Sequence, residues 1–482
     1  MTSSVLTRQT RHLFRSALGA LVFVVAGGHG AGAAVTISSK PTEHMSCSAG
    51  VCTPTAAKAW LNTGDLETML ASGNATVKTT GSEVQATDIT VDAGVSWSTS
   101  STLVLDAYRS VTIDRPVSVD GLAGLSILTN DGGSNGLFLF GQHGNVTFTD
   151  LSSGLSINGT SYTLENSIQS LAAAIANNPS GAYALANSYD ASQDGTYSAA
   201  PISAPLSGLF EGLGNAISNL SISDTSDTEV GLFAELDSNG AIRDISITSA
   251  DISGTAFQAA VGSLAGYNYG KIIGASSSGA VAGRLDETGF AGGLVGYYGD
   301  GIIELSHSSS RVSGYIAGGL AGWGGFTIDQ SFATGTVLGS GNAGGLAGLV
   351  PGATITNSYA TGTVKGPRSA DTDAGGFVGA ADEAALFSAS YSTGRVKGGE
   401  RQSRGGFAGV ITDASFAHCY WDTTTSGVSH KGVGNVKNEP GVTGLTTEQL
   451  QSGLPAGFDP KVWAEDPDIN KGLPYLLSNP PK

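Results

Sequence analysis

Carboxylate side chains recur at similar places in consecutive stretches of this chain, and they are the residues best suited to chemistry. Asp382, Glu383 and Asp413 each follow a short glycine-rich phrase, and Asp300 occupies the equivalent position in an earlier repeat. Two carboxyl groups within about 5 to 10 Å of each other can cleave a glycosidic bond. If successive stretches lie side by side, Glu383 and Asp413 fall within that range. Turns also attract acidic residues, so the same side chains suit exposed turns that do no chemistry.

Cysteine and histidine offer a second set of reactive side chains. Cys47 and Cys52 lie five residues apart, and in an exported protein they could form a disulfide. His418, Cys419 and His430 come nearest to a metal site, but their spacing matches no zinc pattern. Cys419 replaces a serine in a repeated column, which favours a small buried filler over a nucleophile. No phosphate loop or serine elbow is found, so we predict no cofactor and no metal.

The elements that would position the carboxylates are repeats built on a five-residue glycine phrase. Successive copies begin 26 to 31 residues apart. A fixed period of this length predicts a solenoid. The alternative is a flexible glycine-rich linker, but a linker needs no regular columns of apolar side chains. The copies begin at Gly292, Gly318, Gly344, Gly375 and Gly405, after a degenerate copy at Gly262.

The second half of each repeat supplies columns of one residue type. A ring recurs five residues before a valine, as in Phe332, Tyr359 and Tyr391, and Tyr420 holds this place in the last copy. The residue before each of these rings is a serine or, in the last copy, a cysteine. Side chains that repeat in this way stack when each repeat is one coil of a solenoid. We therefore predict that these four rings form a structural ladder.

Local patterns favour strands over helices. Short apolar runs are bounded by glycine and polar turns, and no long amphipathic helical period is found between residues 205 and 425. We predict an all-β chain folded as a parallel β-helix, with a short helical insertion and a C-terminal cap. The predicted parts are a signal peptide (1–34), a flexible N-terminal arm (35–60), irregular β-helix coils with a helical insertion near 166–177 that Asn166 caps (61–204), the repeat β-helix (205–425), and a C-terminal cap and tail (426–482).

Composition and charge narrow the class of protein. The chain has 482 residues, 71 of them glycine, and only 13% of its residues are charged. It is too apolar for a disordered chain and too rich in glycine for an ordinary α/β enzyme. A net charge of −17 argues against a nucleic-acid partner. The basic and then apolar N-terminal stretch predicts export, and no later stretch is long enough to span a membrane.

The glycine phrase with the segment from Asn357 to Val364 resembles the GLUG repeat of large bacterial exoproteins. The segment from Trp97 to Val119 and the tail from Tyr420 to Leu476 are similar to parts of the filamentous haemagglutinin family. The resemblance implies a right-handed parallel β-helix, a secreted or surface location and a role in adhesion. The two-partner secretion motifs of that family are not found in this chain. GLUG repeats also accompany some immunoglobulin A peptidases, but the His-Glu-x-x-His motif of such zinc proteases is absent.

Three functions remain open on the sequence alone. We expect an exported, adhesin-like protein without catalysis that binds an extracellular glycan or a host or bacterial surface protein. Rows of hydroxyl groups such as Thr356, Thr361 and Thr363 suit that role, although they suit any solvated strand. The alternatives are a polysaccharide hydrolase or lyase that uses Glu383 and Asp413, and a purely structural extracellular scaffold.

Overall fold

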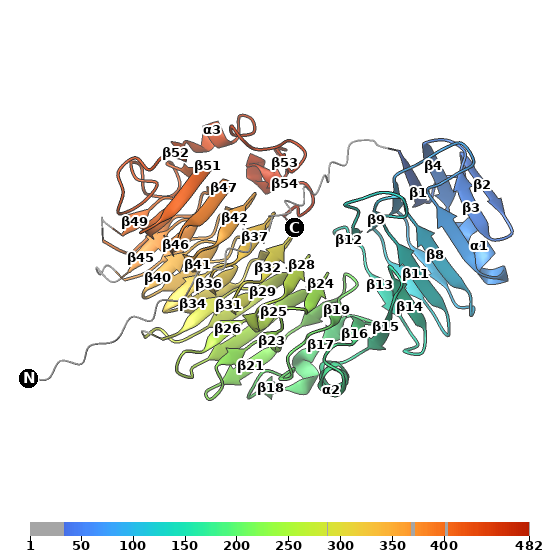
Figure 1. The fold of residues 1–482 in the computed structure, drawn as a ribbon, viewed down its shortest axis with the longest axis horizontal. Coiled ribbons are helices and arrows are strands. Elements are labelled where there is room, and N and C mark those ends of the chain that lie inside the picture. Colours follow the sequence, from blue (N-terminus) through green and yellow to red (C-terminus); the bar gives the residue numbers. More distant parts are fainter. Residues whose placement is uncertain (1–32, 287, 368–371, 401–402, 482) are drawn as a thin grey trace, which may run out of the picture.

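The computed structural model describes residues 33–286, 288–367, 372–400 and 403–481, and most of them lie in strands or in turns between strands (Figure 1). Strands of successive coils pair in parallel, so the chain is a parallel β-helix, as predicted. The α-helices of the described residues are α1 (Thr63–Ser72), α2 (Ile168–Asn177) and α3 (Thr447–Leu450). None of the helices in these ranges is long and apolar enough to cross a membrane. Of the predicted signal peptide (1–34), residues 1–32 lie outside the described residues.

The first solenoid segment comprises residues 33–157 and encloses its own apolar core. Its strands are β1 (Ala34–Ser38), β2 (Met45–Ser48), β3 (Val51–Pro54), β4 (Lys58–Asn62), β5 (Ala75–Lys78), β6 (Asp88–Val91), β7 (Val95–Trp97), β8 (Thr102–Asp106), β9 (Val111–Ile113), β10 (Val117–Val119), β11 (Gly124–Leu128), β12 (Phe138–Phe140), β13 (Val146–Phe148) and β14 (Gly154–Ile157).

Residues 35–60 are the first coil of this segment, so the prediction of a flexible arm was wrong. Strand β1 pairs in parallel with both β4 and β6. Val35 and Ile37 of β1 and Leu61 of β4 are fully buried. Because apolar and polar residues alternate in these short strands, the apolar side chains all lie on one face. Burial of that face in the core orders residues 35–60.

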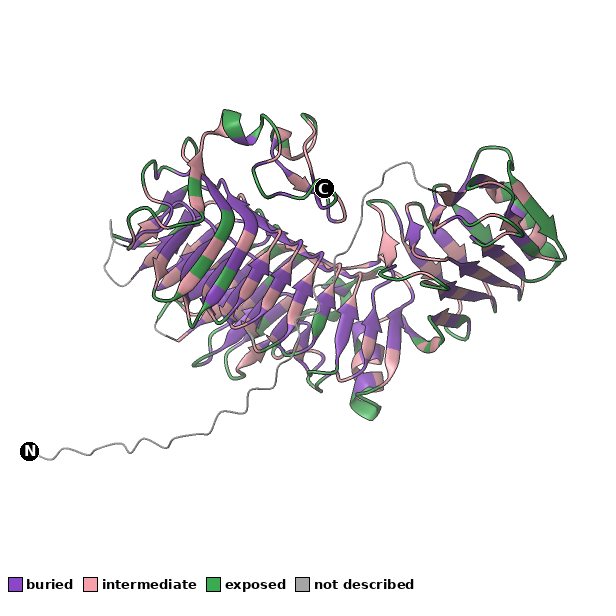
Figure 2. Ribbon diagram, turned by 45° about the horizontal axis from the view of Figure 1, so that its top comes forward, coloured by how far each residue is buried: buried purple, intermediate pink, exposed green. Residues whose placement is uncertain are grey.

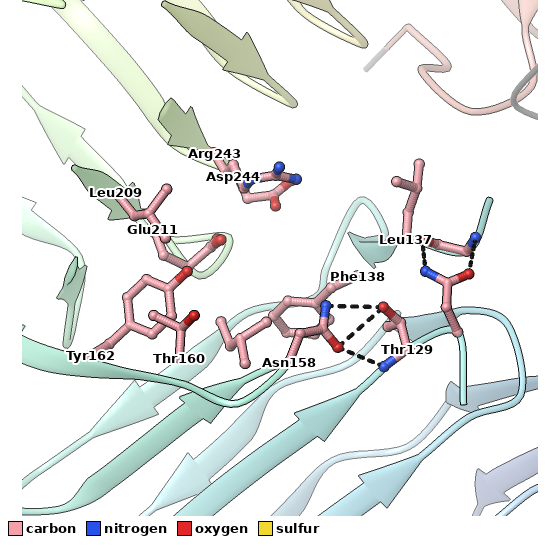
Figure 3. Close-up of a pocket in the computed structure, with 13 residues that line it drawn as sticks. Thr129, Leu137, Phe138, Asn158, Thr160, Tyr162, Leu209, Glu211, Arg243 and Asp244 are labelled. Carbon is pink, nitrogen blue, oxygen red and sulfur yellow. Dashed lines mark hydrogen bonds between the residues drawn. The ribbon is translucent and has the colours of Figure 1, made fainter. Parts of the chain in front are cut away.

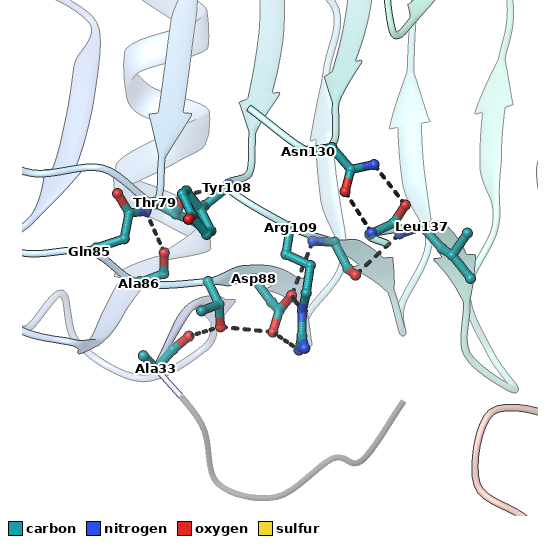
Figure 4. A network of polar contacts seen from close by, with 12 residues as sticks. Ala33, Thr79, Gln85, Ala86, Asp88, Tyr108, Arg109, Asn130 and Leu137 are labelled. Atoms are coloured by element: carbon teal, nitrogen blue, oxygen red, sulfur yellow. Dashed lines mark hydrogen bonds and ion pairs between the residues drawn. The ribbon is translucent and has the colours of Figure 1, made fainter. Parts of the chain in front are cut away.

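A polar network holds the start of the first segment to its later coils (Figure 4). Arg109 forms a 2.6 Å ion pair with Asp88, and the backbone N–H of Ser110 donates to the same carboxylate. The Thr87 hydroxyl donates to the Ala33 carbonyl, 2.6 Å away. Burial of Asp88 opposes ionisation, but the hydrogen bonds from Arg109 and Thr87 lower its pKa below the ordinary value. The carboxylate therefore stays charged and joins its own coil to the next one, while Thr87 extends the network to Ala33.

The chain reverses direction between the two solenoid segments. Strand β14 pairs antiparallel with β15 (Thr160–Glu165), and Ile157 lies opposite Thr160. The two residues between them, Asn158 and Gly159, have φ values of 50° and 79°. A two-residue Asn-Gly loop with positive φ at both positions is the turn that tight hairpins prefer. The predicted division at residues 204 and 205 lies within the second segment, whereas the bend between the segments lies at residues 158–159, between β14 and β15 (Figure 1).

The second solenoid segment comprises residues 160–445 and has the larger apolar core (Figure 2). Its first sheet contains β22 (Glu229–Val230), β26 (Ala260–Gly262), β30 (Phe290–Gly292), β35 (Ile316–Gly318), β40 (Asn342–Gly344), β45 (Asp373–Gly375) and β49 (Arg404–Gly405). Its second sheet contains β23 (Phe233–Leu236), β27 (Ala265–Asn268), β31 (Val295–Tyr298), β36 (Ala321–Gly324), β41 (Ala347–Pro351), β46 (Val378–Asp382) and β50 (Ala408–Ile411). The third face begins with β16 (Ala182–Leu185) and β19 (Leu209–Glu211) and continues through β24 (Ala241–Arg243), β28 (Lys271–Ile273), β32 (Ile302–Glu304), β37 (Thr327–Asp329), β42 (Thr354–Thr356), β47 (Ala385–Ser392) and β51 (Ala414–Asp422), ending at β52 (Val442–Leu445).

Helix α2 forms the predicted insertion near the start of this segment. It begins after Ser167, whose hydroxyl accepts the N–H of Ser170, and not after Asn166 as predicted. Both residue types cap helices well, so the sequence alone does not separate two adjacent candidates. Ile168, Leu171 and Ile175 of this helix are buried against the core.

The glycine phrase lets neighbouring backbones approach closely. A Cβ atom at Gly345 would lie 2.1 Å from the carbonyl oxygen of Gly376, and one at Gly319 would lie 2.1 Å from that of Gly345. Neither glycine has a positive φ. The phrase therefore consists of glycine because of steric contact and not because of a left-handed backbone. The leucine that follows, Leu346, is fully buried in the core.

The C-terminal tail, residues 446–481, covers the aromatic ladder on one side of the solenoid. The rings of Phe332 and Tyr359 stack 4.6 Å apart, and those of Tyr359 and Tyr391 stack 5.2 Å apart. The tail packs Trp463 and other apolar side chains on these rings in a cluster of its own. It then reaches back to His307, whose Nδ1 lies 3.1 Å from Asn479 Oδ1. The predicted cap thus runs along the flank of several coils.

Candidate functional site

A cavity lies at the junction of the two solenoid segments, and we call it the elbow cavity (Figure 3). Its volume is about 280 Å³, just below the usual range for ligand pockets. The first segment, the β14–β15 hairpin and the first coils of the second segment all contribute to it. Its lining residues are Thr129, Asn130, Gly136, Leu137, Phe138, Ile157, Asn158, Thr160, Tyr162, Leu209, Glu211, Arg243 and Asp244.

The two walls of the elbow cavity are held together by hydrogen bonds between the segments. The N–H of Val146 in β13 donates to the Leu213 carbonyl, and that of Phe148 donates to the Ala186 carbonyl, each over 2.9 Å. The buried amide of Asn215 donates to the Val146 carbonyl over 2.8 Å. The last coil of the first segment is therefore joined by hydrogen bonds to the first coils of the second.

A pair of carboxyl groups from adjacent coils lies at the bottom of this site. Glu211 ends β19, and its side chain is only 2% exposed. Asp244 follows β24 in the next coil, and its carboxyl group lies within hydrogen-bonding reach of that of Glu211. Gly274 makes room for it, because a Cβ there would lie 2.3 Å from Asp244 Oδ1. The N–H of Leu213 donates to Glu211 Oε1 over 3.2 Å.

Burial makes this carboxyl pair unusually hard to ionise. It raises the pKa of Glu211 to about 7, against the opposing effects of the Arg243 charge and of hydrogen bonds. Burial also raises the pKa of Asp244 well above its ordinary value, and the neighbouring Glu211 raises it further. Two acidic groups this close cannot both ionise easily, so burial and their mutual repulsion favour a protonated carboxyl in the pair. The pair can then donate one hydrogen bond and accept others.

Arg243 and Tyr162 supply hydrogen-bond donors beside the carboxyl pair. Arg243 lies next to Glu211 in the strand register. Its guanidinium forms no hydrogen bond or ion pair with any other described residue, so its N–H groups are available to a ligand. Burial, followed by the charge of Glu211, raises the pKa of Tyr162 to about 12, so its hydroxyl stays protonated. Asn158 and Thr129, which hydrogen-bond to each other, line the opposite wall.

The carboxylates predicted from the repeats lie elsewhere. Glu383 and Asp413 occupy exposed turns of adjacent coils, after β46 and β50. Adjacent placement agrees with the repeat spacing, and exposure to solvent is typical of turn carboxylates. Asp300 also lies in a turn, between Gly299 and Gly301. Whether Glu383 and Asp413 act together stays a prediction.

The other reactive residues have structural surroundings. Cys47 and Cys52 form a disulfide across the hairpin of β2 and β3. Cys419 is fully buried, and burial raises the pKa of its thiol to about 12, which does not suit a nucleophile at neutral pH. Within the described ranges, no three His, Cys, Asp or Glu side chains are arranged to hold a metal ion, and His418 and His430 are no exception.

Sequence reasoning missed the elbow cavity for identifiable reasons. Glu211 and Asp244 occupy irregular coils before the glycine phrase becomes regular, so no column singles them out. The signal that was present is Asn158-Gly159 between two alternating strands, the strongest short-range mark of a hairpin. That turn predicts a reversal of the chain, and a reversal within a solenoid makes a junction where a cavity can form.

Comparisons with known proteins match part of the chain. Residues 339–365 match the family model of the GLUG motif. Among solved structures, the chain is similar to a Bacteroides ovatus protein described as a "putative immunoglobulin A1 protease", with 17% identity and a TM-score of 0.40 over 66% of this chain and 92% of that chain. No curated protein matches the chain. The GLUG part of the resemblance is thus confirmed, and the link to filamentous haemagglutinins stays a prediction.

Proposed function

We propose that this protein is an extracellular, adhesin-like β-helix protein that binds a glycan in the elbow cavity. The GLUG match and the parallel β-helix fit an extracellular protein. The observation that carries the proposal is the polar lining of the cavity, which combines a buried carboxyl pair, a guanidinium that forms no hydrogen bond with any described residue, and a tyrosine hydroxyl.

The chemistry of this lining suits a ligand with many hydroxyl groups. Each sugar hydroxyl both donates and accepts a hydrogen bond, and the protonated carboxyl pair does the same. Arg243 offers donors, while Asn158 and Thr160 offer both roles. Phe138 and Tyr162 add partly buried rings against which the apolar face of a sugar can pack. A strongly anionic ligand is disfavoured by the carboxyl pair.

The test is retention on a panel of immobilised bacterial and host polysaccharides. Arg243→Met and Tyr162→Phe each remove donors from the cavity, and we expect each to weaken binding by about ten-fold. Glu83→Gln is the matched control, because it changes an exposed carboxylate that belongs to neither candidate site, and we expect no effect. If all three variants bind the retained glycan as the unchanged protein does, the ligand site is not the elbow cavity.

The carboxyl pair favours hydrolysis as a second candidate function. An ionised carboxyl can take a proton from water while its protonated partner donates one to the leaving group, as in other carboxyl pairs that share a proton. The two groups lie closer together than the carboxylates of most glycosidases, which are about 5 to 10 Å apart. New reducing ends that form with the unchanged protein and disappear with Glu211→Gln would identify an enzyme. Binding without new ends would leave the adhesin-like function.

A further inference from the structure

A row of aromatic side chains follows one column of the second segment. Tyr267, Tyr297 and Trp323 occupy matching positions in β27, β31 and β36. The ring centroids of Tyr267 and Tyr297 lie 4.8 Å apart, and those of Tyr297 and Trp323 lie 5.0 Å apart. Phe290 of β30 lies 4.9 Å from Trp323, and Tyr269 lies 6.3 Å from Tyr267. We call these five side chains the aromatic row.

The aromatic row belongs to the surface and not to the core. None of its members is fully buried, and Tyr269 is 37% exposed. The same column continues in the next coils with Leu349 and Ala380. The fold therefore does not require large rings at this position. A contiguous row of partly exposed aromatic side chains is typical of an interaction site.

Three carboxylates lie at one end of the aromatic row. Glu235 occupies the position directly before Tyr267 in the column, in β23. Burial, followed by the charges of Asp237 and Glu229, raises the pKa of Glu235. The charges of Glu229 and Glu235 both act on Tyr267, so the carboxylates and the row are neighbours.

These carboxylates lack cationic partners. The Thr228 hydroxyl donates to Glu229 over 2.8 Å, and Asp237 accepts from its own turn. No lysine or arginine in the described parts of the chain forms an ion pair with Glu229, Glu235 or Asp237. The charges of Asp237 and Glu229, which raise the pKa of Glu235, leave a negative potential that a bound cation would relieve. The faces of the neighbouring aromatic rings also attract cations.

We propose that the aromatic row and its three carboxylates bind a cationic segment of a partner protein. Lysine or arginine side chains of that segment would lie over the rings and pair with Glu235. The row extends over three coils, which suits an extended chain with several cations better than a single small ammonium ion. An uncharged glycan would leave the carboxylates uncompensated. This site is separate from the elbow cavity and does not depend on the function proposed for it.

The test uses the full chain and a short fluorescent peptide of alternating lysine and glycine, with its Nε-acetylated form as the uncharged counterpart. We expect anisotropy to show binding of the first peptide and little binding of the second. Glu235→Gln should weaken binding by about five-fold. Glu383→Gln makes the same change in net charge in a distant part of the sequence and should change affinity by less than about two-fold. Equal effects of the two variants would mean general attraction to an acidic protein and would overturn the proposal.

A second variant tests the rings themselves. Trp323→Leu places in this column the residue that the next coil already has at Leu349, so the variant should fold with an unchanged melting temperature. We expect about three-fold weaker binding, most clearly at raised salt, where long-range attraction is screened. Binding should also weaken as the pH falls through the raised pKa of Glu235, because the protonated carboxyl no longer pairs with a cation. Affinity that is insensitive to both changes, or that is equal for the acetylated peptide, would exclude this site.

Discussion

At the scale of single residues, Glu211 makes the strongest prediction about pH. Its pKa is raised from 4.5 to about 7 in the folded chain, so the folded state holds the proton more tightly than the unfolded state. The resulting stability is fully present below about pH 4.5 and is lost as the pH rises through 7. Glu211→Gln keeps the shape without the charge, so it should raise the free energy of unfolding at pH 8 by about 1–3 kcal/mol and leave it nearly unchanged at pH 4.

Urea denaturation at the two pH values measures this difference. Asp373, whose pKa burial raises to about 6, contributes a slope of the same sign, so the comparison must be between variants and not of one protein across pH. Glu383→Gln is the control, and its pH dependence should match that of the unchanged chain. If Glu211→Gln had the same pH dependence of stability as the unchanged chain, the Glu211 carboxyl would ionise as freely in the folded state as in the unfolded state.

Cys419 makes a second prediction, because it stands in a column of serines. The hydroxyls of Ser331, Ser358 and Ser390 each donate to the carbonyl two residues earlier, over 2.7 to 2.9 Å. The thiol of Cys419 makes the same contact with the Ala417 carbonyl at 3.7 Å. Cys419→Ser should therefore shift the melting temperature by less than about 2 °C in either direction, since a hydroxyl fits this contact. A large loss in calorimetry would mean that the sulfur fills space that oxygen leaves empty.

The structural residues could be predicted from the sequence, whereas the residues of the elbow cavity could not. The ladder rings Phe332, Tyr359 and Tyr391 stack because each repeat places one ring at the same position, and a period is visible in a single sequence. Glu211 and Asp244 come together through a hydrogen-bonded junction and a reversal of the chain. Their proximity depends on tertiary structure that no local pattern encodes. Periodicity pointed instead to Glu383 and Asp413, which the coils expose.

At the scale of elements, the close contact between coils at the glycine phrase can be tested by one side chain. Gly345→Val places a Cβ 2.1 Å from a backbone oxygen, and no rotamer relieves that contact. We expect a loss of about 3 kcal/mol or more in the free energy of unfolding. Gly154→Val is the control, because Gly154 lies in strand β14 and a Cβ there meets nothing within 4 Å. Equal losses in urea denaturation would mean that valine is unfavourable for reasons other than contact between coils.

The elements themselves were predictable where they repeat and where they carry turn or cap residues. The parallel coils of the second segment follow from the glycine phrase and its period. The first coil, β1 to β4, has no such repeat. Its apolar runs are too short to distinguish a strand from an unstructured arm in the sequence alone. Its order comes from pairing with β6, some fifty residues later in the chain. Long-range pairing of this kind is not visible in a local window.

At the scale of the whole molecule, the C-terminal tail and the solenoid are two layers with separate cores. Trp463 packs against Phe458, Tyr391 and Tyr359, with ring centroids 4.5, 5.9 and 6.1 Å away. These residues form a cluster distinct from the one that fills the coils. Because the coils keep their own core and their own backbone hydrogen bonds, the tail can open locally while the solenoid stays folded.

Trp463→Ala tests this division of the molecule. Removing a fully buried tryptophan should cost about 3–5 kcal/mol, and that cost falls on the tail because the side chain contributes nothing to the solenoid core. We expect the far-ultraviolet spectrum and the main unfolding transition to be retained, while a hydrophobic dye binds to the uncovered ladder. Trp60→Ala, at a half-buried position in the first segment, should bind no extra dye. If Trp463→Ala instead unfolds the whole chain in one earlier transition, the ladder cannot exist without its cover, and the tail is then part of the cooperative unit that holds the coils together.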